Sequence, residues 1–326
     1  MPELNMVDAI HDALTTAMEA DDTVMILGED VGANGGVFRA TDGLQAKFGE
    51  DRVVDTPLAE GVIAGAAVGL AIAGMTPIAE IQFLGFAHQA YHQIADQVAR
   101  FRSRSQGRFN LPIVIRSPFG GGVRAPELHS DALEAQFVHC PGLKVVCPAT
   151  AHDAKGLLLA SIADPDPVLF LKPLRGYRLV SDDVPEEAYT VEIGKARVVR
   201  PGTDITLIGW SAGVFLAEKA ADVLAKDGIS AGVVDIRTLA PLDIDTIVAE
   251  VSATGRAVIV QEAAMTCGFG AEVAATLAAE AFFSLESPIT RVGAPDAPYP
   301  LPGLEKMYIP DVAAVVAGAK AAMEAV

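Results

Sequence analysis

Two residues of this chain have side chains and surroundings suited to moving protons, Glu60 and His129. Glu60 lies in the first turn of a helix predicted over residues 58–74, and small uncharged residues follow it. A carboxyl group there can hold or share a proton, unless it is only a first-turn acid favoured by the helix dipole. His129 follows a glycine loop at 120–122. An imidazole in such a loop suits proton transfer, although a loop histidine without a role is equally consistent.

A third motif, the pentapeptide Gly209–Gly213, matches the G-x-S-x-G turn that presents a nucleophilic serine in many hydrolases. It lies between a predicted strand and a predicted helix, as that motif requires, and would make Ser211 the nucleophile. In those enzymes the catalytic histidine follows the serine, whereas all 6 histidines of this chain precede Ser211. A tight helix-capping turn is therefore the favoured interpretation, and a self-contained hydrolase stays as an alternative.

Other ligand-binding patterns in the chain are weak. His88 and His92 share a face of a predicted helix and could bind a metal, but no third ligand has a recognisable spacing. Gly268–Gly270 is only a fragment of the dinucleotide-binding fingerprint, and the phosphate-binding sequence G-x-x-x-x-G-K-[ST] is absent. These segments favour ordinary structural roles.

The composition excludes several classes of protein. Of the 326 residues, 51% are hydrophobic but only 6% are aromatic, so we expect a core of small aliphatic side chains. The formal charge of −18 argues against nucleic acid or an anionic membrane as a partner, and leaves room for a basic protein partner. We expect no transmembrane helix and no signal or transit peptide. The 3 cysteines show neither paired nor metal-binding spacing, which predicts a reducing, cytoplasmic location.

The elements that would position these residues alternate between short apolar strands and longer helices. This alternation predicts βαβ units and two three-layer α/β/α domains with mainly parallel sheets. A charged stretch around Pro185 divides the two series, which gives a first domain over 1–180, a linker over 181–195 and a second domain over 196–326. Strands are predicted over 23–27, 53–55, 76–82, 113–117, 144–147, 168–171, 205–210, 231–236, 257–261 and 289–292. Helices are predicted over 2–20, 58–74, 87–102, 153–163, 213–226, 244–251 and 271–281, with a last one beginning at 310.

Several segments, taken together and in their order along the chain, resemble those of a known protein family, although none of them alone is specific to it. They are Gly28–Val31, Gly36–Arg39, Thr56–Glu60, Ala79–Phe83, Arg116–Pro118, Glu127–Ser130, His139–Val146, Asp235–Leu239 and Gln261–Ala263. Over essentially its whole length, the chain resembles the β subunit of the thiamine-diphosphate-dependent decarboxylase (dehydrogenase) component of 2-oxo-acid dehydrogenase complexes. The amino acids of three segments look most like those of the branched-chain members: Gly36–Phe38, Ala79–Phe83 and Arg104–Asn110. Pyruvate and acetoin members share most of these amino acids.

The resemblance implies a fold, an activity and a set of site residues. The fold would be a transketolase-like pyrimidine-binding domain followed by a transketolase C-terminal-like domain. The activity would be oxidative decarboxylation of a 2-oxo acid with reductive acylation of a lipoyl group. Glu60 matches the glutamate that hydrogen-bonds the cofactor's aminopyrimidine ring, and Leu58, Gln82 and Phe86 match positions that line this ring. His129 matches a histidine at the substrate end, which assists transfer to the lipoyl group.

The resemblance also implies a monovalent-cation site, of the kind that holds potassium in relatives. Its ligands would be the carbonyl groups of Leu111, Ile113 and Val114, together with Ser161, Asp164 and Asp166. Relatives often have asparagine where this chain has Asp166, and an ordinary acidic turn is the alternative interpretation of the Asp-Pro-Asp-Pro sequence.

One expected part of the cofactor site is missing from this sequence. Relatives bind the diphosphate and its magnesium ion through a Gly-Asp-Gly segment, which this chain lacks. The resemblance therefore implies an α subunit that supplies the other half of the site in an α2β2 assembly. It further implies docking to a lipoyl acyltransferase core, whose small basic subunit-binding domain would meet the acidic C-terminal part of the chain. A non-catalytic scaffold is the remaining alternative, and it would not need Glu60, Gln82 and His129 together.

Overall fold

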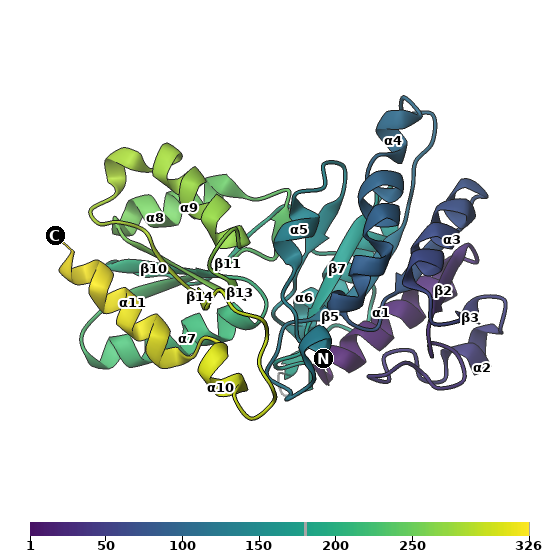
Figure 1. The fold of residues 1–326 in the computed structure, drawn as a ribbon, viewed down its shortest axis with the longest axis horizontal. Coiled ribbons are helices and arrows are strands. Elements are labelled where there is room, and N and C mark those ends of the chain that lie inside the picture. The colour runs from purple at the N-terminus through teal and green to yellow at the C-terminus, as the bar shows by residue number, and fades with distance from the viewer. Residues whose placement is uncertain (179–180, 326) are drawn as a thin grey trace.

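The computed structural model describes residues 1–178 and 181–325, which form two α/β halves side by side (Figure 1). The sheet of the first half has 7 strands in the order β12-β6-β7-β5-β4-β2-β3. Six of its strands are β2 (Val24–Gly28), β3 (Val53–Asp55), β4 (Thr76–Glu80), β5 (Val114–Phe119), β6 (Lys144–Val146) and β7 (Val168–Pro173). Its α-helices are α1 (Met6–Ala20), α2 (Leu44–Phe48), α3 (Glu60–Ile72), α4 (Phe101–Arg104), α5 (Glu134–Val138) and α6 (Ala151–Ala163).

The sheet of the second half has 5 strands in the order β14-β13-β10-β11-β9. They are β9 (Arg197–Arg200), β10 (Ile205–Gly209), β11 (Ala231–Asp235), β13 (Ala257–Ala264) and β14 (Thr290–Ala294), with β9 antiparallel to its neighbour. The helices are α7 (Ala212–Lys226), α8 (Ile244–Thr254), α9 (Phe269–Glu280), α10 (Glu305–Tyr308) and α11 (Val312–Glu324), with a 3-10 turn at Phe282–Ser284. The predicted α/β class with two mainly parallel sheets is confirmed.

Helices cover both faces of each sheet because the strands are apolar on both sides. Every residue of β2 and of β10 is buried, as expected of parallel strands inside a layered domain. In the first half, α1 and α6 pack on one face, and α3 with the helical segment after β4 packs on the other. In the second half, α7 and α11 form one outer layer, and α8 and α9 form the other.

The segment predicted as one α-helix over 87–102 differs in the structure. It consists of the 3-10 helix η1 (Leu84–Ala90), the π-helix η2 (Gln93–Val98) and the short α4. This segment packs closely on α3, because a Cβ atom added to Gly61 would lie 3.2 Å from the carbonyl oxygen of Gln89. The prediction of a regular α-helix was therefore wrong in type, since apolar periodicity does not distinguish an α-helix from a tighter or wider one.

Two short strands pair with strands of the first predicted domain, although they lie outside it in the sequence. β8 (Ser181–Asp183), inside the predicted linker, pairs antiparallel with β1 (Glu3–Asn5) at the N-terminus. β12 (Thr238–Ala240), from the second half, pairs antiparallel with β6 and forms an edge of the first sheet. Strands of three residues are too short to show a periodicity, so neither could be predicted from the sequence. The predicted boundaries at 180 and 196 stay predictions.

None of the helices formed by residues 1–178 and 181–325 has the length and apolar character that spanning a bilayer requires.

Candidate functional site

The carboxyl ends of four neighbouring strands bring the predicted site residues to one edge of the first sheet. β5, β4, β2 and β3 are adjacent and parallel, so their carboxyl ends meet at this edge. Glu60 follows β3, Glu29 follows β2, Gln82 follows β4 and His129 follows β5. Ligands of open α/β sheets bind at this edge. The fold therefore gathers residues up to 100 positions apart into one candidate site.

Glu60 is the first residue of α3, and its side chain is buried against the apolar helix. The residue is only 3% exposed, and its Oε2 atom has no hydrogen-bond partner among the described residues. A buried oxygen without a partner is costly, so this atom is available to a group that the chain itself does not contain. Burial, followed by the carboxylates of Asp30 and Glu60, raises the pKa of the neighbouring Glu29.

Gln82 contacts the same group of acids from the next strand. Its Nε2 atom donates a hydrogen bond to Oδ2 of Asp30 at 3.2 Å. The amide of Gln82 is thereby oriented by a residue that follows β2, and Asp30 itself has a positive φ of 60°. Sequence reasoning missed Glu29 and Asp30, although their position directly after a fully buried strand could have identified them.

His129 lies in the 3-10 turn η3 (Glu127–His129) and packs on two aromatic rings. Its ring centroid is 4.4 Å from that of Phe83, at an interplanar angle of 56°, and 5.0 Å from that of Phe86. Its Nδ1 atom is buried and has no hydrogen-bond partner within the described chain. The structure thus brings the predicted residues Phe86 and His129 together and adds Phe83, which the sequence reasoning did not single out.

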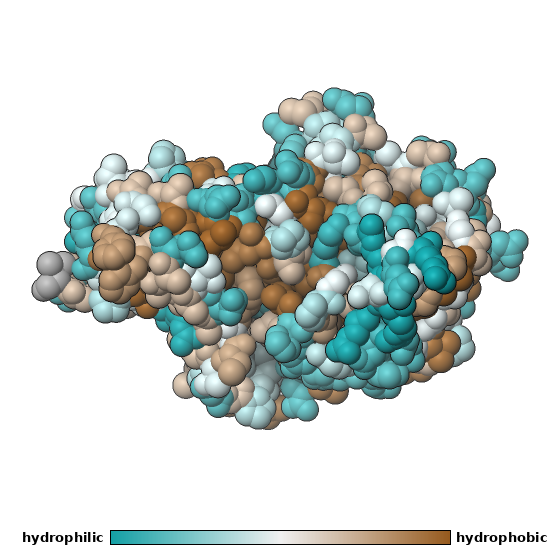
Figure 2. Space-filling model, turned by 90° about the horizontal axis from the view of Figure 1, so that it is seen from above, coloured by the Kyte–Doolittle hydropathy of each residue, from teal (hydrophilic) through white to brown (hydrophobic). Residues whose placement is uncertain are grey.

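Leu58 differs from the other predicted site residues because it is exposed. It precedes α3 and is 70% exposed, and Val62 on the first turn of the helix is 62% exposed. The two exposed aliphatic side chains place apolar surface directly beside the buried carboxyl group of Glu60. Figure 2 shows further apolar surface on the face seen from above, where brown side chains gather along the middle of the molecule.

A buried ion-pair cluster fixes the strand ends beneath the site. Glu80 ends β4, and its two carboxylate oxygens accept hydrogen bonds from Arg116 Nε at 2.6 Å and Lys172 Nζ at 2.5 Å. Burial, followed by repulsion from Arg116, lowers the pKa of Lys172 to about 7. Removing one partner of such a buried cluster is strongly destabilising, so these residues hold the scaffold in place.

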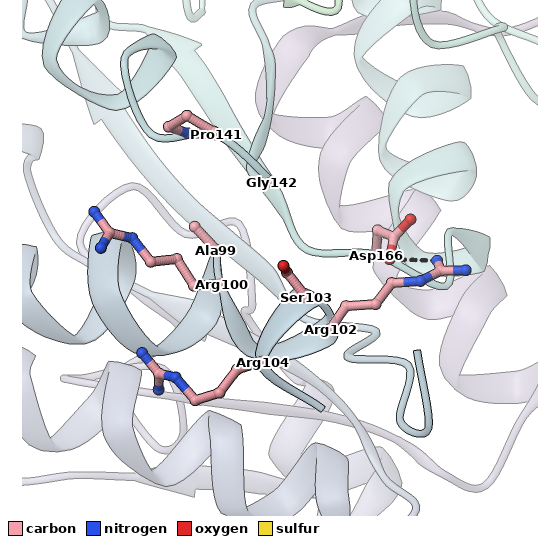
Figure 3. Close-up of a pocket in the computed structure, with 8 residues that line it drawn as sticks. All are labelled: Ala99, Arg100, Arg102, Ser103, Arg104, Pro141, Gly142 and Asp166. Atoms are coloured by element: carbon pink, nitrogen blue, oxygen red, sulfur yellow. Dashed lines mark hydrogen bonds and ion pairs between the residues drawn. The ribbon is translucent and has the colours of Figure 1, made fainter. Parts of the chain in front are cut away.

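The two aspartates of the predicted cation site already have cationic partners from the chain. Lys144 Nζ donates to both oxygens of Asp164, at 2.7 and 2.6 Å. Arg102 Nη1 donates to Asp166 Oδ1 at 2.6 Å, as the dashed line in Figure 3 shows. In the same view Arg100 and Arg104 point away from Arg102, so the arginines do not converge on one ligand.

The predicted carbonyl and hydroxyl ligands are also partly engaged. The carbonyl of Ile113 accepts the N–H of Val168 at 2.9 Å, and that of Leu111 accepts the N–H of Ile113 at 2.8 Å. Ser161 Oγ donates to the carbonyl of Leu157 at 2.7 Å. A potassium ion would depend on the second lone pairs of such carbonyls, including that of Val114 in β5. Potassium binding here stays a prediction.

The remaining sequence motifs form no catalytic or metal-binding group among the described residues. Ser211 precedes α7, as a helix-capping turn would place it, but its side chain makes no capping hydrogen bond. Ser211 has a φ of 53° and is 2% exposed, and its Oγ atom has no hydrogen-bond partner in the described chain. A serine that contacts no base is not an activated nucleophile, so the hydrolase alternative has no support here. His88 Nε2 lies 3.1 Å from Gln136 Oε1, and His92 Nδ1 lies 3.0 Å from Asp96 Oδ2, so each ring has its own partner.

Comparison with known proteins identifies the family. Residues 2–178 match the family described as "Transketolase, pyrimidine binding domain", and residues 194–315 match "Transketolase, C-terminal domain". The chain is 52% identical over 324 residues to the "Pyruvate dehydrogenase E1 component subunit beta" of Bacillus subtilis, with 99% of this chain and 100% of the relative covered. The chain belongs to the E1 β-subunit family of 2-oxo-acid dehydrogenases. A relative of the same name from Staphylococcus aureus gives the same identity and coverage.

A solved structure adds a fold-level comparison for this E1 β-type chain. The structure described as "Split gene transketolase, inactive beta4 tetramer" superposes with a TM-score of 0.80 and covers 99% of both chains, at 23% sequence identity. The likeness supports the fold alone. Family membership confirms the association with thiamine diphosphate and the enzyme class. The names of these relatives favour pyruvate as the substrate, which was the alternative, over the branched-chain 2-oxo acids that three segments of the sequence had suggested.

Proposed function

We propose that this chain is the β subunit of a pyruvate dehydrogenase E1 component, active only with an α subunit. The observation that carries the proposal is the buried carboxyl group of Glu60, whose Oε2 has no hydrogen-bond partner among the described residues and lies at the edge where ligands of such sheets bind. Relatives with 52% sequence identity are named as pyruvate dehydrogenase subunits, and we therefore propose pyruvate as the substrate. A branched-chain 2-oxo acid and acetoin are the alternatives.

Glu60 would hold the cofactor by one hydrogen bond to the aminopyrimidine ring of thiamine diphosphate. When bound, the cofactor would supply the nucleophilic carbon and the electron sink that decarboxylation of a 2-oxo acid requires. The carboxyl group of Glu60 would hold and move the proton at a ring nitrogen, which is the role of a general acid–base group. Phe86 and Gln82 would line the ring, and Leu58 would cover it from the exposed side.

His129 would act at the substrate end of the same site. Its imidazole is held by Phe83 and Phe86, and its buried Nδ1 atom has no partner in the described chain. A ring fixed on one side by aromatic contacts keeps a polar atom available for a proton of the substrate or of the lipoyl group. Its proposed task is transfer of the acyl group to the lipoyl carrier.

The other half of the site would come from the α subunit of an α2β2 assembly. The chain lacks the Gly-Asp-Gly segment for diphosphate and magnesium, so we propose that magnesium is held mainly by the α subunit. The exposed aliphatic residues Leu58 and Val62, beside Glu60, suit burial against this partner. A potassium ion at Leu111–Val114 is a lesser part of the proposal, because Lys144 and Arg102 neutralise Asp164 and Asp166.

The second half would dock a lipoyl acyltransferase core through its basic subunit-binding domain. Glu272, in the first turn of α9, and Glu280, its last residue, are exposed, and the fully exposed Phe283 follows Glu280 by three positions. Exposed acids and an exposed apolar side chain on one segment suit a small basic partner. The location in the cell stays predicted as cytoplasmic.

The deciding experiment measures turnover of the purified chain with and without the α subunit of the same organism. Thiamine diphosphate and magnesium are present in both arms, and pyruvate is compared with a branched-chain 2-oxo acid. We expect turnover only with the α subunit, and faster with pyruvate. Turnover by the chain alone would contradict the two-subunit proposal, and preference for the branched-chain acid would contradict the substrate. Failure of the assembled pair to bind the cofactor would favour the scaffold alternative.

A further inference from the structure

The loop that carries His129 is closed on itself and begins with three glycines. The N–H of Gly120, after β5, donates to the carbonyl of Asp131 at 3.1 Å, so residues 120–131 form a closed loop. Gly120 and Gly122 have positive φ values of 77° and 93°, which glycine adopts without strain. Between these ends lies η3 with His129.

Two carboxylates from the second half of the chain bind the main chain of this loop. Glu262, in β13, accepts the N–H of Gly121 on its Oε1 atom at 3.0 Å. Glu305, in α10, accepts the N–H groups of Gly122 and Arg124 on its Oε1 atom, each at 3.0 Å. Two N–H groups of the loop, those of Gly122 and Arg124, thus converge on one oxygen of Glu305, and the N–H of Gly121 has an acceptor of its own.

Contacts with the second half also explain why residues 120 and 121 of the loop are glycines. A Cβ atom at Gly120 would lie 2.6 Å from Oε2 of Glu262, and one at Gly121 would overlap the phenol ring of Tyr299. Tyr299 donates its own hydroxyl to Oε1 of Glu305 at 2.7 Å, so the same oxygen accepts three hydrogen bonds. The N–H groups of this glycine loop are therefore engaged within the chain and do not form a cradle for a phosphate.

The far side of the loop rests on η1, next to the aromatic rings that hold His129. A Cβ atom at Gly85 would overlap the carbonyl oxygen of Leu128, the residue before His129. The loop is thus fixed at two places, by carboxylates of the second half and by η1 beneath the imidazole. Between Arg124 and η3, residues 125 and 126 belong to no helix or strand. Loss of the carboxylate contacts would free the loop on that side.

We propose that Glu305, assisted by Glu262, is a positioning residue for His129, acting through the main chain of the loop at 120–124. The second half of the chain then shapes the catalytic site as well as contributing to assembly. This inference rests on the proposed function of His129 in lipoyl transfer.

The first test follows amide hydrogen exchange of residues 121–124 in the chain assembled with its α subunit. Glu305→Ala removes the acceptor and is expected to speed this exchange by about 10-fold or more, since a hydrogen bond to a charged group contributes about 1.5–3 kcal/mol. Glu305→Gln keeps a side-chain oxygen that can accept from the main-chain N–H groups, and is expected to restore part of the protection. Glu324→Ala, at an exposed acid of the same half at the end of α11, is the control. Unchanged exchange in Glu305→Ala would overturn the proposal.

Should Glu305→Ala fail to fold, Tyr299→Phe serves as the second variant. It removes one donor to Glu305 and leaves both main-chain contacts in place. We expect amide hydrogen exchange at residues 121–124 to be slower than in the wild type or equal to it, because Glu305 then accepts hydrogen bonds from the main chain alone. Faster exchange would mean that the tyrosine, rather than the carboxylate, holds the loop, and would overturn the assignment to Glu305.

The second test combines Glu305→Ala with His129→Ala and measures acyl transfer to a lipoyl domain. If Glu305 acts through His129, its replacement slows transfer in the wild type but adds little in the His129→Ala background. Additive losses would overturn the proposed route. If His129→Ala alone leaves transfer unchanged, the proposed function of His129 fails, while the exchange experiment still decides whether Glu305 holds the loop.

Discussion

The imidazole ring of His129 lies 4.4 Å from the ring of Phe83, although β5 and the loop after it separate the two residues in sequence. Phe83 and Phe86 follow β4, and His129 follows β5, the neighbouring parallel strand. The contact therefore joins two turns at the same edge of the sheet. It fixes the imidazole on one side and leaves the buried Nδ1 atom without a partner in the described chain.

Replacement of His129 should separate two partial reactions. We expect His129→Ala to slow acyl transfer to a lipoyl domain by about 10²–10⁴-fold, the range for a general acid–base group. Reduction of an artificial electron acceptor should change much less, because that assay does not require transfer to the lipoyl group. His88→Ala is the matched control, since His88 contacts Gln136 outside this aromatic cluster. Equal losses in both assays would contradict the assignment.

Glu60→Gln should keep the fold and the assembly but slow activation of the cofactor. Glutamine is isosteric and can still form one hydrogen bond, but it cannot hold or release the proton. Exchange of hydrogen for deuterium at the cofactor's reactive carbon, measured in the α2β2 enzyme, is expected to slow by about 10²–10⁴-fold. Glu29→Gln changes the neighbouring acid and should have a smaller effect. An unchanged rate in Glu60→Gln would remove this residue from the mechanism.

Val62→Asp should weaken binding of the α subunit without unfolding the chain. Val62 is 62% exposed on α3, so a carboxylate there meets water in the isolated chain and costs little stability. In the assembly the same charge would be buried without a partner, which is unfavourable by several kcal/mol. Sedimentation of the mixed subunits measures the effect, and Val223→Asp on α7 is the control because Val223 is also exposed. Normal assembly of Val62→Asp would place the partner elsewhere.

Asp235 should make the stability of the chain fall as pH rises toward neutrality. Burial, followed by the carboxylate of Asp153, raises the pKa of Asp235 to about 7 in the folded chain. An unfolded aspartate ionises near pH ~4, so between about pH 4 and 7 the folded chain holds a proton that the unfolded chain has lost. The stabilisation is complete below this window and is lost as pH rises through it.

Urea unfolding at about pH 5.5 and about pH 8 measures this effect. At about 1.4 kcal/mol per pH unit, the wild type should lose on the order of 2 kcal/mol from this group over that interval. Asp235→Asn cannot ionise and should lose correspondingly less, whereas Asp222→Asn, at an exposed residue of α7, should behave as the wild type. Identical pH dependence in wild type and Asp235→Asn would contradict the prediction.

Docking of a basic subunit-binding domain should depend on salt. Among the acids in this part of the chain, Glu286 already pairs with Arg256 at 2.7 Å and Asp296 accepts two hydrogen bonds from Thr266. Glu272 and Glu280 remain as the exposed acids of α9. Charge attraction is screened beyond about 10 Å at 0.1 M salt, so the on-rate should fall at roughly 0.5 M salt. An on-rate indifferent to salt would leave these acids a role in solubility alone.

The sequence predicted the elements that have a strong period and missed those whose geometry depends on tertiary contacts. Buried strands such as β2 and β10 were predicted to within one residue, because continuous apolar runs between turn residues are unambiguous. The prediction of an α-helix at 87–102 was wrong in type, because apolar periodicity does not reveal the 3-10 and π turns that this segment forms where it packs on α3.

The candidate site shows the same division. Glu60, at the start of an otherwise uncharged helix, and His129, after a glycine loop, could be singled out from the sequence itself, whereas Leu58, Gln82 and Phe86 followed from the resemblance. Glu305 could not be found, because its partners are main-chain N–H groups 181 and 183 residues away, which leave no pattern in the local sequence. Long-range contacts between a side chain and a distant main chain are visible only in the folded chain.

The edge strand β12 has a consequence for how this protein can be synthesised. The first sheet is not complete until Thr238–Ala240 has left the ribosome, because no other strand of the described residues pairs with β6 on that side. Until then, the nascent chain presents an open strand edge to other chains, a known route to aggregation. A gene truncated after the first family match, at residue 178, should therefore yield insoluble product, and a usable expression fragment must extend past residue 240.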